Sequence, residues 1–216
     1  MGQYYEAVIA DPMKRKAVKN YRKYVPYDFD NGAKLMEHSY IGTNITGEIE
    51  NHIYEYGPRR IMWFGDYTYD DPSDCIDAKN RNGILPTQAE VAKIQKNEPE
   101  FFSKTLYNDE FVEKYKNSFL VNHTQKLYID MARYWKENRT KQKCYIVDAP
   151  TQPTYEWRTW CVDPLPILTA TVNHSGGSYY GPNEDKACSW TWDIIAIEDE
   201  PPASYKEVMY HFKEFA

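Results

Sequence analysis

Residues 59–67 read RRIMWFGDY, and the run from Ile61 to Phe64 is apolar at every position. A short apolar run of this kind predicts a strand that is buried on both of its faces. The residues that follow, 66–82, are acidic and rich in turn formers, so we expect the strand to end at their start.

A helix is predicted immediately before this strand. Its apolar side chains recur with helical spacing at Ile45, Ile49, Ile53 and Tyr56. Thr43 or Asn44 can cap its start, and the pair Gly57-Pro58 ends it.

Three more helices are expected further along the chain. Thr87 and Glu90 form a capping box that opens the first, and the second follows Asn108. Ser204 and Glu207 form another capping box, which predicts a helix at the C-terminal end of the sequence.

The other expected elements are strands. They cover residues 4–9, 33–39, 145–147, 158–170 and 189–198. Pro164 and Pro166 interrupt the fourth of these, which is typical of an edge strand or a bulge. Residues 118–130 predict a β-hairpin that turns at 122–125, although Leu127, Met131 and Trp135 also fit a helix.

Together these elements predict the fold class α+β: a single compact domain, residues 1–216, with a mainly antiparallel sheet and several flanking helices. Helices and strands are interspersed without regular βαβ spacing, which disfavours a parallel, doubly wound sheet. A helical insertion is expected at about residues 70–119.

The charge of the chain argues against a protein that binds duplex nucleic acid. The net charge is −6 and the pI is about 5.4, whereas duplex binders present a basic face to the phosphates. The one dense basic run lies in residues 14–23, which could hold a small phosphorylated ligand, contact an acidic partner or form a solvated face. The 20 Tyr and 6 Trp residues either build an aromatic core or line a ligand site.

Several other classes of protein are also disfavoured. No apolar stretch approaches the ~20 residues of a membrane span, and the first residues lack a signal peptide, so we expect a cytoplasmic protein with reduced cysteines. The five His and four Cys residues lack metal-ligand spacing, and the acidic residues 66–77 lack the EF-hand pattern. We therefore expect no metal and no cofactor, and the catalytic residues, if any, stay unknown.

The remaining candidates are polar and aromatic residues at predicted strand ends and turns, where a rigid scaffold often holds binding residues. These candidate ligand-binding residues are His38, Trp63, Asp66, Tyr67, Asn122, His123, Asn173, His174, Gly176, Gly177 and Tyr179. Asp66 can accept ligand hydroxyl groups or cap a turn, and the glycines can admit an anion or turn a hairpin. A histidine is more often a structural residue than a catalyst, and each of these can be one.

Six blocks of sequence resemble an uncharacterised family of bacterial and bacteriophage proteins. The blocks are MGQYY (1–5), LMEHSYIG (35–42), WFGDY (63–67), LVNHT (120–124), PLPILTA (164–170) and GGSY (176–179). Phe64 stands where relatives tend to have a small residue, and residues 70–119 look like an enlarged insertion. The resemblance implies a small cytosolic protein of a bacterium or phage. It implies no particular activity, because the family has none assigned.

Three functions fit these patterns. The first is a non-catalytic binding protein for a nucleotide-like small molecule, which in a phage would act as a counter-defence sponge for an immune signalling nucleotide. The alternative is a hydrolase or phosphodiesterase that uses His and Asp on such nucleotides, or an interaction module that inhibits a host protein. We expect the binding protein, without a membrane or duplex partner and with a homo-oligomer as an open option.

Overall fold

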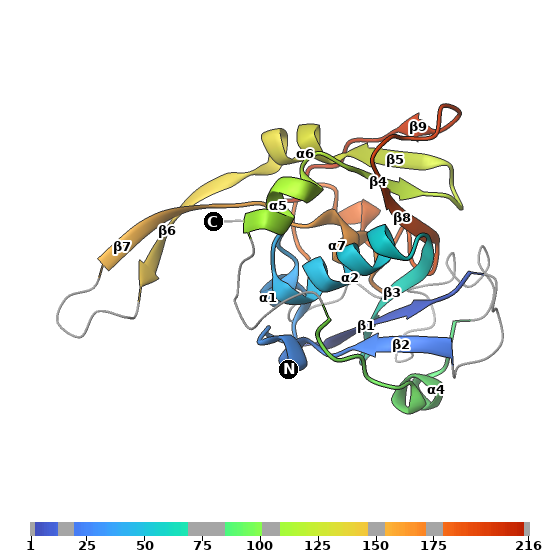
Figure 1. Cartoon of the computed structure of the whole chain (residues 1–216). Coiled ribbons are helices and arrows are strands. Elements are labelled where there is room, and N and C mark those ends of the chain that lie inside the picture. Colours follow the sequence, from blue (N-terminus) through green and yellow to red (C-terminus); the bar gives the residue numbers. More distant parts are fainter. Residues whose placement is uncertain are drawn as a thin grey trace.

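The computed structural model describes residues 3–12, 20–68, 85–100, 109–146, 154–171 and 179–213. Its main feature is a seven-stranded sheet, in which every neighbouring pair but the last is antiparallel (Figure 1). In spatial order the strands are β2 (Tyr21–Tyr24), β1 (Tyr5–Ala10), β3 (Arg59–Gly65), β8 (Ile194–Glu198), β4 (Phe119–Asn122), β5 (Leu127–Asp130) and β9 (Lys206–Glu207). The mainly antiparallel α+β fold that the sequence predicts is therefore confirmed.

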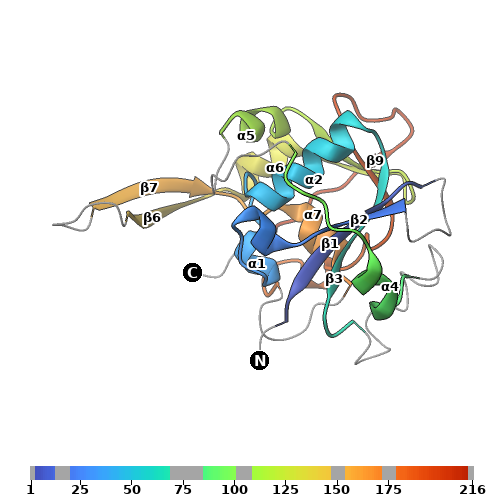
Figure 2. The same ribbon diagram turned by 60° about the horizontal axis from the view of Figure 1, so that its bottom comes forward.

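Two more strands form a separate two-stranded antiparallel sheet, β6 (Thr140–Ile146) with β7 (Thr154–Trp160). This sheet extends away from the rest of the described chain, and both views show it as a projecting arm (Figures 1 and 2).

The helices are short apart from α2. They are α1 (Leu35–His38), α2 (Asn44–Glu55), α4 (Gln88–Lys93), α5 (Asp109–Tyr115), α6 (Met131–Asn138) and α7 (Pro164–Thr169). Two 3₁₀ helices, η2 (Pro26–Phe29) and η3 (Glu184–Lys186), complete the described elements. The capping box of Thr87 and Glu90 opens α4 as predicted.

The sheet has a core on each face, because alternate residues of a strand point to opposite sides. On one face Ile61 and Trp63 of β3 pack with apolar residues of α2 and α7. On the other face Met62 and Phe64 pack with residues around α4 and with Trp192. The double burial predicted from RRIMWFGDY is thus confirmed.

Parts of two predicted strands, 33–39 and 158–170, are helices in the structure, while residues 158–160 of the second belong to β7. Residues 35–38 form α1, whose buried residues Leu35 and His38 are spaced as one helical face requires, and Glu37 caps its start. Residues 164–169 form α7, because Asp163 caps the first turn and Pro164 is well suited to the first helical position. The prolines therefore start a helix and do not mark an edge strand.

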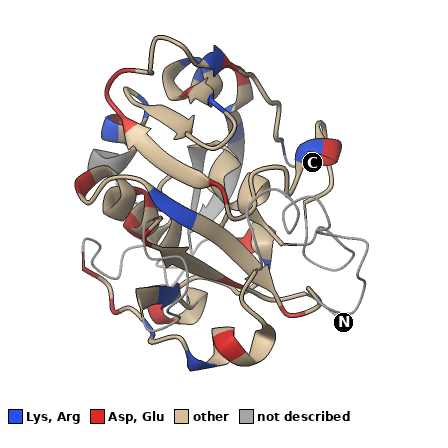
Figure 3. Cartoon of the chain, turned by 90° about the vertical axis from the view of Figure 1, so that its right-hand side faces the viewer, with Lys and Arg blue, Asp and Glu red and all other residues tan. Residues whose placement is uncertain are grey.

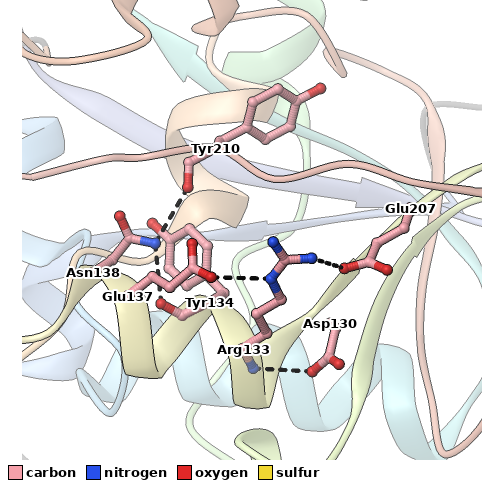
Figure 4. A network of polar contacts seen from close by, with 7 residues as sticks. All are labelled: Asp130, Arg133, Tyr134, Glu137, Asn138, Glu207 and Tyr210. Carbon is pink, nitrogen blue, oxygen red and sulfur yellow. Dashed lines mark hydrogen bonds and ion pairs between the residues drawn. The ribbon is translucent and has the colours of Figure 1, made fainter.

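The predicted C-terminal helix is also wrong. Lys206 and Val208 instead donate backbone hydrogen bonds to the carbonyls of Lys126 and Tyr128, which makes β9 a parallel edge strand beside β5. Further along, the Asn138 amide of α6 bonds the Tyr210 carbonyl at 3.2 Å (Figure 4). The segment that contains Ser204 and Glu207 therefore pairs with the sheet edge and does not form the capped helix that these two residues predicted.

Arg133 ties α6 to the same edge strand. Its guanidinium contacts Glu137 and Glu207 at 3.0 Å each (Figure 4). Because the pairs are solvent-exposed, we expect Arg133→Ala to leave the midpoint of a urea titration nearly unchanged. Lys136→Ala on the same helix is the control, and a clearly lower midpoint for Arg133→Ala than for this control would contradict the expectation.

Two carboxyl groups meet inside the protein. Glu50 of α2 and Asp163 are both inaccessible to solvent, and their carboxyl groups lie near enough for each to affect the pKa of the other. Burial, together with the negative charge of Asp163, raises the pKa of Glu50 well above its usual value. Burial also raises the pKa of Asp163 to about 6. The pair therefore retains a proton where ordinary carboxyl groups are ionised.

Candidate anion-binding site

The predicted site residues His38 and Trp63 lie together, but in the core. The Trp63 Nε1–H donates to His38 Nε2 at 2.9 Å, and His38 Nδ1 bonds the Gly32 carbonyl at 2.8 Å. Burial lowers the pKa of His38 to about 4, so its ring is neutral and accepts the indole proton. Both side chains are fully buried and serve packing, which is the structural alternative foreseen for each histidine.

Asn122 and His123 lie at the turn between β4 and β5. The buried Asn122 amide donates to Asp193 Oδ2 at 2.8 Å, and its oxygen accepts the Gln125 backbone N–H. His123 contacts Glu198 at 2.8 Å and the Tyr205 hydroxyl at 3.1 Å. These contacts hold the end of the hairpin against neighbouring segments of the fold.

The other predicted residues lie apart from these two groups. Asp66 directly follows β3, and its carboxylate accepts the Tyr4 backbone N–H at 3.1 Å, which joins the end of β3 to the start of β1. Tyr67 lies in the turn that follows. Tyr179 is buried, and its hydroxyl donates to the Pro182 carbonyl at 2.8 Å. The predicted residues Asn173, His174, Gly176 and Gly177 lie outside the described residues. The described candidates therefore do not converge on one site.

A polar pocket lies elsewhere, where β1 ends and β2 begins. It has a volume of about 260 Å³ and is open to solvent. Its lining residues are Ile9, Ala10, Asp11, Asn20, Arg22, His52 and Arg59. This end of the β1–β2 hairpin lies at the right of Figure 1, and the same side is turned to the viewer in Figure 3.

The topology explains why these residues meet. Arg22 of β2 is paired with Ile9 of β1, and Arg59 begins β3 on the other side of β1. Helix α2 crosses the same face of the sheet and contributes His52. Two cationic side chains from different strands therefore flank one imidazole ring.

The pocket has an excess of positive charge. Neither Arg22 nor Arg59 has a carboxylate within ion-pair distance among the described residues, and Asp11 is the only acidic residue in the lining. Arg59 is held by its own backbone, since its guanidinium donates to the carbonyls of Gly57 and Pro58 at 3.3 and 2.8 Å. The neighbouring Arg60 is different, because it is buried and donates to the Trp192 carbonyl at 2.8 Å.

His52 is neutral at physiological pH. Burial and the charge of Arg59 lower its pKa to about 4, with a smaller contribution from Arg22 and an opposing one from Glu100. The ring nitrogen Nδ1 lies 3.4 Å from the Tyr24 hydroxyl, and the Tyr56 ring packs at a centroid distance of 4.7 Å. Tyr56 is 49% exposed, and its hydroxyl donates to Glu100 at 2.7 Å. A bound anion would therefore meet two arginines, an imidazole and a nearby aromatic ring.

One part of this site was noted in the sequence analysis, and the other parts were not. Arg22 belongs to the basic run 14–23, for which a small phosphorylated ligand was one interpretation. Arg59 stands in the RRIMWFGDY stretch, but nothing in the sequence separates its role from that of the buried Arg60. His52 lies among the apolar residues of the α2 pattern, and only the crossing of α2 over the sheet brings it to Arg22.

Other site types find no support in the described residues. That part of the chain contains no cluster of three or more His, Cys, Asp or Glu side chains able to hold a metal ion. None of its helices has the length and apolarity that a membrane span requires. Comparisons of the chain with protein-family models, with curated proteins and with solved structures found no match.

Proposed function

We propose that this chain binds a small phosphorylated, nucleotide-like molecule in the pocket lined by Arg22, His52 and Arg59. The observation that carries the proposal is the meeting, in one open pocket, of two arginines that have no carboxylate partner among the described residues. Guanidinium groups form strong, often bidentate hydrogen bonds with phosphate oxygens. Tyr56, which is half-exposed beside His52, offers a ring on which a base can stack.

The size of the pocket narrows the ligand. A volume of about 260 Å³ is just below the ~300–1,000 Å³ of pockets that enclose drug-sized molecules. It suits one phosphate with an adjoining ribose or base, so a mononucleotide or one end of a larger signalling nucleotide is the expected occupant. In an infected bacterium, such binding would sequester the nucleotide.

Equilibrium dialysis tests the proposal. A panel of nucleoside mono-, di- and triphosphates, cyclic dinucleotides and ADP-ribose derivatives is offered to the purified protein at micromolar concentration. We expect at least one to be retained and to be recovered intact by mass spectrometry after the protein is denatured. Retention of none of them would refute nucleotide binding.

A hydrolase is the second candidate, because Asp11 and His52 line the same pocket. A neutral imidazole and a carboxylate in one pocket are groups that general acid–base chemistry can use. Recovery of a cleaved nucleotide in the same mass spectra, lost in His52→Gln, would favour this function over sequestration.

Proton-linked binding is expected at the pocket. An anion beside His52 favours the charged imidazolium, so binding raises the pKa of His52 from about 4 and takes up a proton. Affinity should therefore increase as the pH falls from 7 towards 4, by up to tenfold per pH unit. Sulfate is a suitable calorimetric probe because it stays a dianion over this range, and His52→Gln should remove the dependence. An unchanged pH profile in His52→Gln would contradict the linkage.

A further inference from the structure

The projecting arm formed by β6 and β7 has no role in the pocket. Its two strands pair over seven positions, from Thr140 opposite Trp160 to Ile146 opposite Thr154. Among the described residues no third strand joins this sheet, and it stands clear of the body (Figures 1 and 2). An isolated two-stranded ribbon is marginally stable in water, so a binding partner would stabilise the arm.

The register assigns aromatic residues and lysines to positions that share one face of the arm. Lys143 is directly opposite Trp157, and Tyr145 is directly opposite Tyr155. Residues opposite each other in an antiparallel pair share a face, as do alternate residues along each strand. The resulting ring–lysine face consists of the positions of Lys141, Lys143, Tyr145, Tyr155, Trp157 and Thr159.

The arm is also a basic part of an acidic protein. Residues 139–160 contain four basic and two acidic residues, whereas the whole chain has a net charge of −6. Arg139 and Lys141 are exposed where the arm leaves α6. A polyanion would therefore be attracted to the arm and repelled by the chain as a whole.

The mixture of residue types distinguishes between classes of partner. The cores of protein interfaces are enriched in Tyr and Trp but depleted in Lys. Proteins that bind single-stranded nucleic acid combine aromatic residues with basic ones, because the rings stack on bases while the cations neutralise phosphates. From this juxtaposition we propose that the ring–lysine face binds single-stranded nucleic acid without strong sequence preference.

Fluorescence anisotropy of the full chain with a labelled 12-nucleotide oligothymidylate tests this proposal at 50 mM salt. We expect saturable binding whose logarithmic salt dependence has a slope of about −1.4, the value for two phosphate contacts on a single strand. Trp157→Ala should weaken binding about 5- to 150-fold through the loss of one stacked ring, and Trp157→Phe should largely restore it.

A matched charge reversal supplies the control. Lys141→Glu should weaken binding several-fold, whereas Lys126→Glu, at the exposed turn between β4 and β5, should not. The pocket variants Arg22→Ala and Arg59→Ala should bind the oligonucleotide normally, which separates this site from the proposed nucleotide pocket. Circular dichroism establishes that each variant is folded.

Four results would overturn the proposal. They are no anisotropy change at 100 µM protein, equal losses in Lys141→Glu and Lys126→Glu, equal affinity for a duplex of the same sequence, and dimerisation that Lys141→Glu abolishes without any oligonucleotide binding. The last result would assign the arm to a second copy of the chain.

Discussion

The double variant Arg22→Ala, Arg59→Ala is expected to lose binding of the phosphorylated ligand by a factor of about 10²–10⁴. Each guanidinium offers charge-assisted hydrogen bonds to phosphate, and such a bond contributes roughly 1.5–3 kcal/mol. Both guanidinium groups line the same small pocket, so removing them takes away the two cations that line the described part of it. Isothermal titration of wild-type and variant protein with the ligand found by dialysis measures the change.

The fold should tolerate this double substitution. Arg22 is exposed, and Arg59 bonds only nearby backbone carbonyls among the described residues. Arg133→Ala removes a similar exposed cation from α6 and is the matched control, with an expected change in affinity below about twofold. Unaltered affinity in the double variant, with normal unfolding, would place the ligand elsewhere.

The second large effect concerns the stability of the protein as a function of pH. The pKa of Asp163 is raised from 3.8 to about 6 in the folded protein, and the pKa of Glu50 is raised further above its usual value. A carboxyl group of this kind binds its proton more tightly when folded, so its stabilising contribution is complete below pH ~4. That contribution is lost as the pH rises through the folded value. For Asp163 the loss is on the order of 3 kcal/mol between pH 4 and neutrality.

Glu50→Gln tests the origin of this loss. Glutamine resembles the protonated acid and cannot acquire a charge, so the variant should unfold with a weaker pH dependence and be the more stable protein at pH 8. Urea unfolding between pH 4 and 8 measures both quantities. Glu55→Gln is the control on the same helix, since Glu55 is exposed. Parallel pH profiles for wild type and Glu50→Gln would show that the buried pair does not titrate as a unit.

Local patterns in the sequence predicted the elements whose stability is local. The apolar run of β3, the isoleucine spacing of α2 and the β4–β5 hairpin all appear as expected. The predicted strand 189–198 is shortened to Ile194–Glu198, because residues 189–193 form turns that place Trp192 on the second core. Where two local signals compete, as for Asp163 and Pro164, capping of a helix prevails over strand character.

The candidate site was harder to predict because long-range topology assembles it. His38 and Trp63 were predicted to bind a ligand because they are a polar and an aromatic residue near strand ends. In the structure they form a hydrogen bond with each other inside the core. Arg59 and Arg60 are neighbours in sequence, but strand alternation sends one to the pocket and the other to the Trp192 carbonyl. Which arginine is available to a ligand depends on the packing of β8 and α2, which a single sequence does not reveal.

The position of β8 in the sheet has a consequence for how the chain folds. This strand lies between β3 and β4, so it joins the N-terminal strands to the β4–β5 hairpin, yet more than 120 residues of chain separate it from β3. During synthesis β3 and β4 therefore each have an unpaired edge until β8, the strand that joins them, has been made. Such high contact order slows folding and leaves partly formed sheets open to aggregation. We expect the nascent chain to be the form of this protein most dependent on chaperones.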